Sequence, residues 1–147
     1  MSTLLKNRID QLAKEFDSFE SWEDKYKHII SRGKELAPLD EQYRVDSNKV
    51  KGCQSQVWLH ASLQEDKCIR FQADSDASIV KGIIAILLSV YDKASPSEVL
   101  STSPDFLDQI GLKQHLSMSR ANGLNAMVKQ IHFYAMAFQA KLSMTNA

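Results

Sequence analysis

The sequence lacks the two features that would indicate a nucleic-acid or membrane partner, namely an excess of charge and a long apolar run. Lysine and arginine number 18 together, as do aspartate and glutamate, so the formal net charge is zero. Without a charge excess, neither nucleic acid nor an anionic membrane is expected as a partner. The longest strongly apolar run, 83–88, is far too short to span a bilayer, and the N-terminus has no continuous apolar core of the secretory type. The sequence therefore predicts a cytoplasmic protein.

Cysteine is also scarce, since the chain has only Cys53 and Cys68. Two cysteines do not make a disulfide framework, and in a reducing compartment both remain thiols. A structural zinc site usually takes four cysteine or histidine ligands in two close pairs. Here the two cysteines and four histidines are scattered without such pairs, so we expect no metal site.

The chain shows no internal repeat, linker or low-complexity block, and 147 residues suit one domain. We therefore expect a single domain over 1–147, with a core over about 16–142 and fraying in the last four or five residues. Hydrophobic periodicity predicts helices, a β-hairpin and an intervening ordered loop. The helices are expected at 4–16, 21–33, 79–91 and 117–142, with a short one from Ser95; the loop at 35–51; and the strands at 57–63 and 68–73.

Two predictions concern local structure around the hairpin. The segment Asp74-Ser75-Asp76 has the composition of a turn and helix N-cap before the apolar helix at 79–91. That helix is apolar around most of its circumference, which predicts a central position between the sheet and other helices.

Cys53 is the stronger candidate for chemistry, because a thiol reacts as a thiolate and a polar loop favours that form more than an apolar core does. It follows Gly52, which can adopt positive φ, and precedes the polar segment Gln54-Ser55-Gln56. Cys68 lies beside Arg70 in an alternating strand pattern, where a small, half-buried filler is the simpler interpretation.

Two further side-chain types could assist a thiol. A cysteine hydrolase would pair Cys53 with a histidine base, and His60 and His115 are candidates that sequence spacing cannot place. Arg120, at the start of the last predicted helix, could stabilise a nearby thiolate or dock a partner, although plain capping explains this segment equally well.

Four motifs in order resemble the SufE family of sulfur-acceptor proteins. They are WEDKY at 22–26, GCQSQVW at 52–58, DSDASIVKG at 74–82 and SRANGL at 119–124. The resemblance implies an α+β fold, a small antiparallel sheet packed against several helices, similar to the iron–sulfur scaffold proteins of the IscU type.

The resemblance also implies a function. The protein is expected to dock on a PLP-dependent cysteine desulfurase of the SufS type, stimulate it, accept its persulfide sulfur on Cys53, and pass sulfur to the SufBCD scaffold for iron–sulfur cluster assembly. It would be a carrier rather than an enzyme, without a cofactor of its own. A CsdE-type acceptor for a different desulfurase is the nearest alternative, and both a monomer and a homodimer remain open.

The same resemblance implies roles for the residues around the thiol, which is expected to be shielded by apolar side chains at rest. The supporting loop or neighbouring contacts would come from Gly52, Gln54, Ser55, Gln56, Asp74, Ser75, Asp76 and Arg120. Two other classes of protein remain as alternatives: an iron–sulfur scaffold, which needs about three or four clustered ligands, and a thiol hydrolase, which needs a histidine within hydrogen-bonding reach of Cys53.

Overall fold

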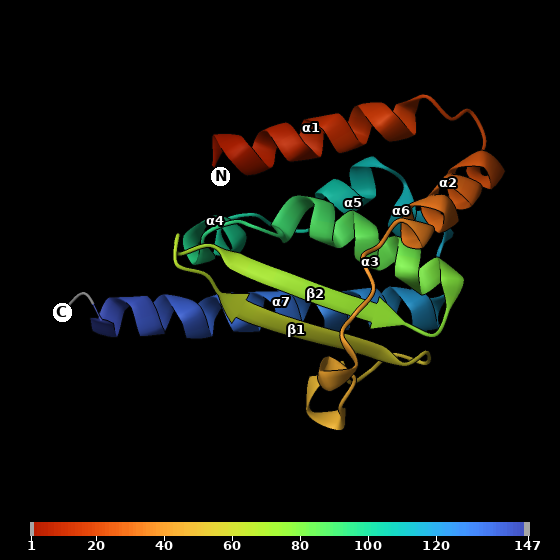
Figure 1. The fold of residues 1–147 in the computed structure, drawn as a ribbon. Coiled ribbons are helices and arrows are strands. Elements are labelled where there is room, and N and C mark those ends of the chain that lie inside the picture. The colour runs from red at the N-terminus through yellow and green to blue at the C-terminus, as the bar shows by residue number, and fades with distance from the viewer. Residues whose placement is uncertain (1, 146–147) are drawn as a thin grey trace.

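A computed structural model describes residues 2–145, and its α+β architecture confirms the predicted fold class (Figure 1). One antiparallel hairpin, β1–β2, packs against the helices. The elements in chain order are α1 (Thr3–Asp17), α2 (Trp22–Lys34), the 3-10 turns η1 (Glu41–Tyr43) and η2 (Asp46–Asn48), β1 (Val57–Leu63), β2 (Ile69–Ser75), α3 (Ser78–Tyr91), α4 (Pro96–Leu100), α5 (Phe106–Gln109), α6 (Leu112–His115) and α7 (Met118–Thr145).

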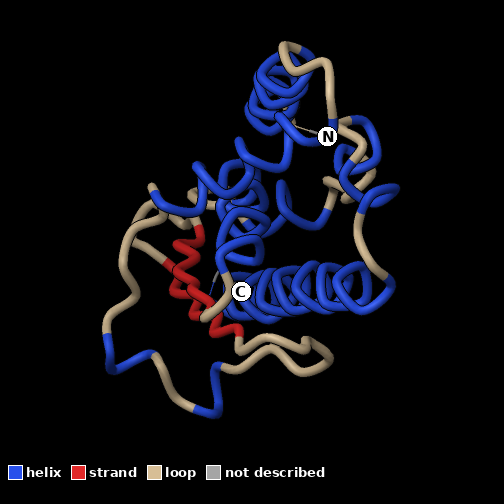
Figure 2. The backbone as a smooth tube through the Cα atoms, turned by 90° about the vertical axis from the view of Figure 1, so that its right-hand side faces the viewer, coloured by secondary structure: helices blue, strands red, loops and turns tan. Residues whose placement is uncertain are grey.

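The hairpin is covered on both faces. Its register pairs Val57 with Ser75 and Leu63 with Ile69, so alternate residues such as Val57 and Leu59 point into the helical core. The other face carries Trp58, which is only 9% exposed. The segment with η1 and η2 forms an outer layer beyond the strands (Figure 2) and places the guanidinium carbon of Arg44 5.0 Å from the centre of the Trp58 ring.

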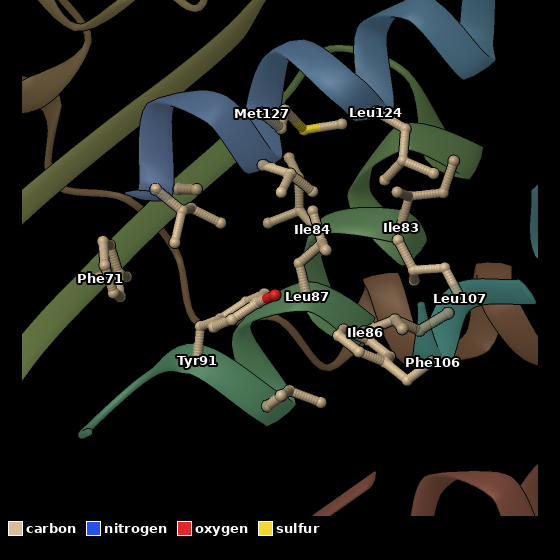
Figure 3. Packing of buried hydrophobic residues seen from close by; sticks show 14 of the residues in the cluster. Phe71, Ile83, Ile84, Ile86, Leu87, Tyr91, Phe106, Leu107, Leu124 and Met127 are labelled. Carbon is tan, nitrogen blue, oxygen red and sulfur yellow. The ribbon is translucent and has the colours of Figure 1, made fainter. Parts of the chain in front are cut away.

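Helix α3 occupies the centre, as its apolar circumference predicts. Ile83, Ile84 and Leu87 of this helix pack among side chains from α7, β2 and α5 (Figure 3). Helix α2 crosses α3 at two glycines, and a Cβ added to Gly33 would lie 2.6 Å from the backbone nitrogen of Gly82. This crossing is therefore a backbone-to-backbone contact that tolerates no side chain at these two positions.

Several predicted boundaries need correction. The N-cap prediction for 74–76 is wrong, because β2 continues through Ser75 and Ala77 is the N-cap of α3. Asp74 and Ser75 are both paired with residues of β1 in the antiparallel sheet. The Ser75 hydroxyl also accepts a hydrogen bond from the Ala77 amide at 3.2 Å. The core begins earlier than residue 16, because Leu5, at the start of α1, is fully buried.

The helices after α4 also differ from the prediction. The four-residue helices α5 and α6 were not predicted, since neither is long enough to show a period. Helix α7 continues through Thr145, so the expected fraying does not reach that residue, while 146–147 lie outside the described part of the chain. Among residues 2–145, no helix combines the length and apolar character needed to cross a membrane.

Candidate functional site

The candidate site is built around a short loop that joins η2 to β1. The Val50 amide donates to the Val57 carbonyl at 2.9 Å, which closes the base of the loop. A second closure joins Gln56 to Asp76: the Gln56 amide donates to Asp76 Oδ1 at 3.0 Å, and the Asp76 amide donates to the Gln56 carbonyl at 3.3 Å. Residues 51–55 therefore project from a fixed base.

Gly52 sets the direction of this loop. Its φ is +94°, a conformation that side chains with a Cβ rarely adopt. A Cβ at this position would lie 3.5 Å from the Cβ of Ala126, so the loop also approaches α7 at van der Waals distance. Gly52 thus uses the positive φ that glycine permits before Cys53.

The Cys53 thiol rests on the first turns of α7. Its Sγ lies 3.6 Å from the Gly123 carbonyl oxygen, to which the thiol donates a weak hydrogen bond. A Cβ on Gly123 would lie 3.3 Å from Sγ and 3.7 Å from the Cys53 Cα. The glycine in the fourth motif thus gives the thiol close access to the helix.

A small cavity of about 70 Å³ adjoins the thiol. Its walls are polar toward the loop and the start of α7, and apolar toward α3 and the next turn of α7. The lining residues are Cys53, Gln54, Ser55, Val80, Ile83, Ser119, Arg120, Gly123 and Met127. Burial raises the pKa of the Cys53 thiol above its ordinary value, so the resting thiol is protonated at neutral pH.

The predicted supporting residues separate into two groups. Gln54, Ser55 and Arg120 line the cavity with Cys53, and Gln56 and Asp76 hold the base of its loop.

Asp74 and Ser75, which are expected from the resemblance to be neighbouring contacts of Cys53, lie inside β2 and do not line that cavity. Asp74 is 5% exposed and pairs with Arg44 and with Lys81, whose Nζ lies 3.5 Å from Oδ1. This carboxylate ties the η1–η2 segment to β2 and α3.

The resemblance implies apolar shielding of the thiol, but it names none of the residues that form the apolar wall of the cavity. Val80 and Ile83 come from α3 and Met127 from α7. Helical periodicity marks all three as buried, but periodicity does not distinguish a residue that fills the core from one that faces a thiol. No local signal in the sequence would have separated them.

The other candidate reactive groups lie elsewhere. Cys68 precedes β2, whereas Cys53 precedes β1, so the antiparallel pair separates them by the length of a seven-residue strand. At ~3.3 Å per residue this is roughly 20 Å, too far for a disulfide within one chain.

The four histidine rings contact residues other than Cys53. His28 contacts Glu15, His60 stacks on Tyr43, His115 stacks on Trp22, and His132 packs against Tyr91. No group of three or more metal-ligating side chains occurs among the described residues.

Fold and site together define a class: a small α+β protein that presents a half-buried cysteine in a loop against a long helix. The family model described as "SufE: Fe-S metabolism associated domain" matches residues 10–135. The chain belongs to the SufE family, a sulfur-acceptor family of iron–sulfur metabolism.

One similar protein supports this family assignment, and one solved structure shares the fold. An uncharacterized SufE-like protein of Rhizobium meliloti (strain 1021) is 42% identical over 127 residues, covering 84% of this chain and 91% of its own length. The solution structure of a hypothetical protein from Thermus thermophilus superposes with a TM-score of 0.76 at 20% identity, covering 90% of this chain and 96% of that one. The second likeness concerns the fold.

Proposed function

We propose that this protein accepts sulfane sulfur on Cys53 from a PLP-dependent cysteine desulfurase of the SufS type and delivers it to a SufBCD scaffold in the cytoplasm. The observation that carries the proposal is the position of the Cys53 thiol, in a projecting loop of the family motif and against Gly123. In this role the protein is a carrier and an activator of the desulfurase, and Cys53 turns over without a resident cofactor.

The chemistry is thiol exchange on a persulfide. The Cys53 thiol loses its proton to solvent, and the thiolate attacks the outer sulfur of the donor persulfide. A new sulfur–sulfur bond forms on Cys53, the donor bond breaks, and its electron pair leaves with the donor thiolate, which takes up a proton. No external oxidant or reductant enters this step.

The resting site favours protection over reactivity. The raised pKa of Cys53 keeps the thiol protonated, and Val80, Ile83 and Met127 cover it on the apolar side. The cavity of about 70 Å³ is several times the ~10–15 Å³ that a cavity needs to hold one water molecule, which leaves room for one added sulfur atom beside Sγ.

Reaction with a donor then requires the loop to leave α7. Its base is held by the Val50–Val57 and Gln56–Asp76 hydrogen bonds, so residues 51–55 are the segment that can move. We expect the desulfurase to draw this segment outward, which hydrates the thiol and lowers its pKa toward the ordinary value. Amide exchange in residues 51–55 should increase when the desulfurase binds, and equal exchange with and without it would contradict this movement.

The test of the function is mass spectrometry after incubation with free cysteine and a SufS-type desulfurase loaded with PLP. One or more added sulfur atoms should appear on the Cys53 peptide, disappear in Cys53→Ser and persist in Cys68→Ser, the matched control. A second incubation with the desulfurase that serves CsdE-type acceptors compares the two partner assignments. Absence of added sulfur with both enzymes, together with unchanged desulfurase turnover, would refute the acceptor function.

A further inference from the structure

Helix α7 has two opposite apolar faces, and the fold uses one of them. Leu124, Val128, Ile131 and Ala135 are buried against the body of the protein. The second face carries Phe133, Met136 and Met144, which are 61%, 60% and 78% exposed. These residues are joined on the same side by Ala137 and Ala140, both exposed, in the helical spacing of anchors that insert into a groove. We call these five residues, 133, 136, 137, 140 and 144, the outer stripe.

The outer stripe is unusual for a surface. Aromatic and methionine side chains are enriched in the cores of protein interfaces and are a minority on free surfaces. A helix that is apolar on two sides normally has both sides covered. Figure 1 shows α7 continuing past the end of the hairpin toward the C-terminus, so this part of the helix is available to another molecule.

The outer stripe lies on the same face of α7 as the contact with the Cys53 loop, with Lys129 and Gln130 on the turn between them. Ala126, which Gly52 approaches, lies seven residues before Phe133, and two helical turns return a side chain to nearly the same face. The track from Ala126 to Met144 spans 18 residues, which is roughly 27 Å of helix at ~1.5 Å per residue. A protein that reaches the Cys53 loop from this side would lie along the outer stripe.

The charges of α7 identify the chemistry of the occupant. From Met118 to Thr145 the helix contains no aspartate or glutamate, and its charged residues are Arg120, Lys129 and Lys141. Lys129 and Lys141 are exposed, and each lies one turn from a residue of the outer stripe. These positive charges favour a partner with carboxylates.

Two other occupants fit these charges less well. A second copy of this chain would bring four of these lysines to one interface, where like charges oppose association. A membrane-surface helix usually exposes a strongly charged face opposite its apolar one, whereas the opposite face of α7 is buried in the protein.

We propose that the outer stripe is a docking surface for the protein that donates sulfur to Cys53, and that the donor covers it with an apolar groove edged by carboxylates. This inference rests on the proposed function. It adds that the donor recognises the C-terminal half of α7 as well as the reactive loop, so part of the affinity resides on α7 while the sulfur chemistry resides on the Cys53 loop.

The test measures the dissociation constant for a SufS-type desulfurase, and in parallel the persulfidation of Cys53 by inorganic polysulfide. Phe133→Glu and Lys129→Glu should each weaken desulfurase binding by at least about tenfold. Leu4→Glu is the matched control, because Leu4 is an exposed apolar residue at 45% exposure on α1, and it should bind as the wild type does. Reaction with polysulfide should be equal in all four proteins, which shows that the thiol itself is intact.

The other outcomes distinguish failure of the docking proposal from failure of the acceptor function. Wild-type affinity in both α7 variants would overturn the docking surface and leave the acceptor function standing. A wild-type protein that neither binds nor takes sulfur from the desulfurase would overturn the function and the docking proposal together. Sedimentation showing a dimer that Phe133→Glu dissociates, or binding to anionic phospholipid vesicles that Phe133→Glu abolishes, would assign the outer stripe to a second copy or to a membrane instead.

Discussion

Replacing Gly123 by alanine should raise the reactivity of Cys53 without destabilising the fold. The new Cβ would lie 3.3 Å from Sγ, a few tenths of an ångström closer than the ~3.5–4.0 Å of a comfortable contact. The loop that carries Cys53 can yield by this amount, because its fixed points are at Val50 and Gln56. Displacing Sγ weakens its hydrogen bond to the Gly123 carbonyl, hydrates the thiol and lowers its pKa toward the ordinary value.

The change in stability can be bounded from two opposing terms. Alanine in a helix interior is favoured over glycine by about 1 kcal/mol, and an added methyl group that displaces its neighbour costs about 1 kcal/mol where that neighbour is a loop side chain that can yield. The two terms nearly cancel, so the unfolding free energy should change by less than about 1 kcal/mol, at most about 2–4 °C in Tm for a chain of this size.

The assay is the alkylation rate of Cys53 by iodoacetamide at mildly alkaline pH, in a Cys68→Ser background. Gly123→Ala should react severalfold faster than its parent. Asn125→Ala is the control, since Asn125 is exposed and lies two positions along α7, on the opposite side of the helix. A rate equal to or below that of the parent, or a fall of several degrees in Tm, would refute the proposed packing of the thiol on Gly123.

Three further predictions concern stability. Gly33→Ala should lower the unfolding free energy by about 2 kcal/mol in urea denaturation, because its Cβ would lie 2.6 Å from a backbone nitrogen of α3; a loss below about 0.5 kcal/mol would contradict the close crossing. Gly52→Ala should cost about 1–2 kcal/mol through its φ of +94°, and an unchanged urea midpoint would contradict that conformation. The Arg32 guanidinium lowers the pKa of Glu15 from 4.5 to about 2, so this stabilisation is complete above pH 4.5 and is lost as the pH falls toward 2. With one third of the carboxylate side chain exposed, screening leaves about 1–2 kcal/mol, and Glu15→Gln should show a shallower acid slope than the wild type; equal slopes would refute the pairing.

Local patterns predicted most elements because their causes are local. Ser21 caps α2 by accepting a hydrogen bond from the Asp24 amide at 3.1 Å, and Ser95 and Glu98 form a capping box at the start of α4, where a short helix is predicted. The period-two stretch at 57–63 became β1 with the same bounds. Where prediction failed, a distant partner had decided the outcome: Asp74 resembles a cap residue in sequence, but pairing with β1 extends the strand past it.

The candidate site likewise divides into features with local causes, which the sequence shows, and features that depend on distant contacts. The motif identifies Cys53 and supplies a glycine where the chain takes a positive φ, because both are local features of the chain. The apolar wall depends on which helix faces the loop, and α3 and α7 reach it from far along the sequence.

Motifs and periodicities record local chemistry, and they were sufficient to predict the family, the hairpin, the central helix and the identity of the candidate thiol. Three features emerge only from the folded chain: the thiol rests on Gly123, Asp74 and Ser75 lie in β2 outside the cavity, and α7 leaves a second apolar face uncovered. Periodicity shows that a helix face is apolar, but burial depends on what packs there, and that is fixed by contacts between residues distant in the chain.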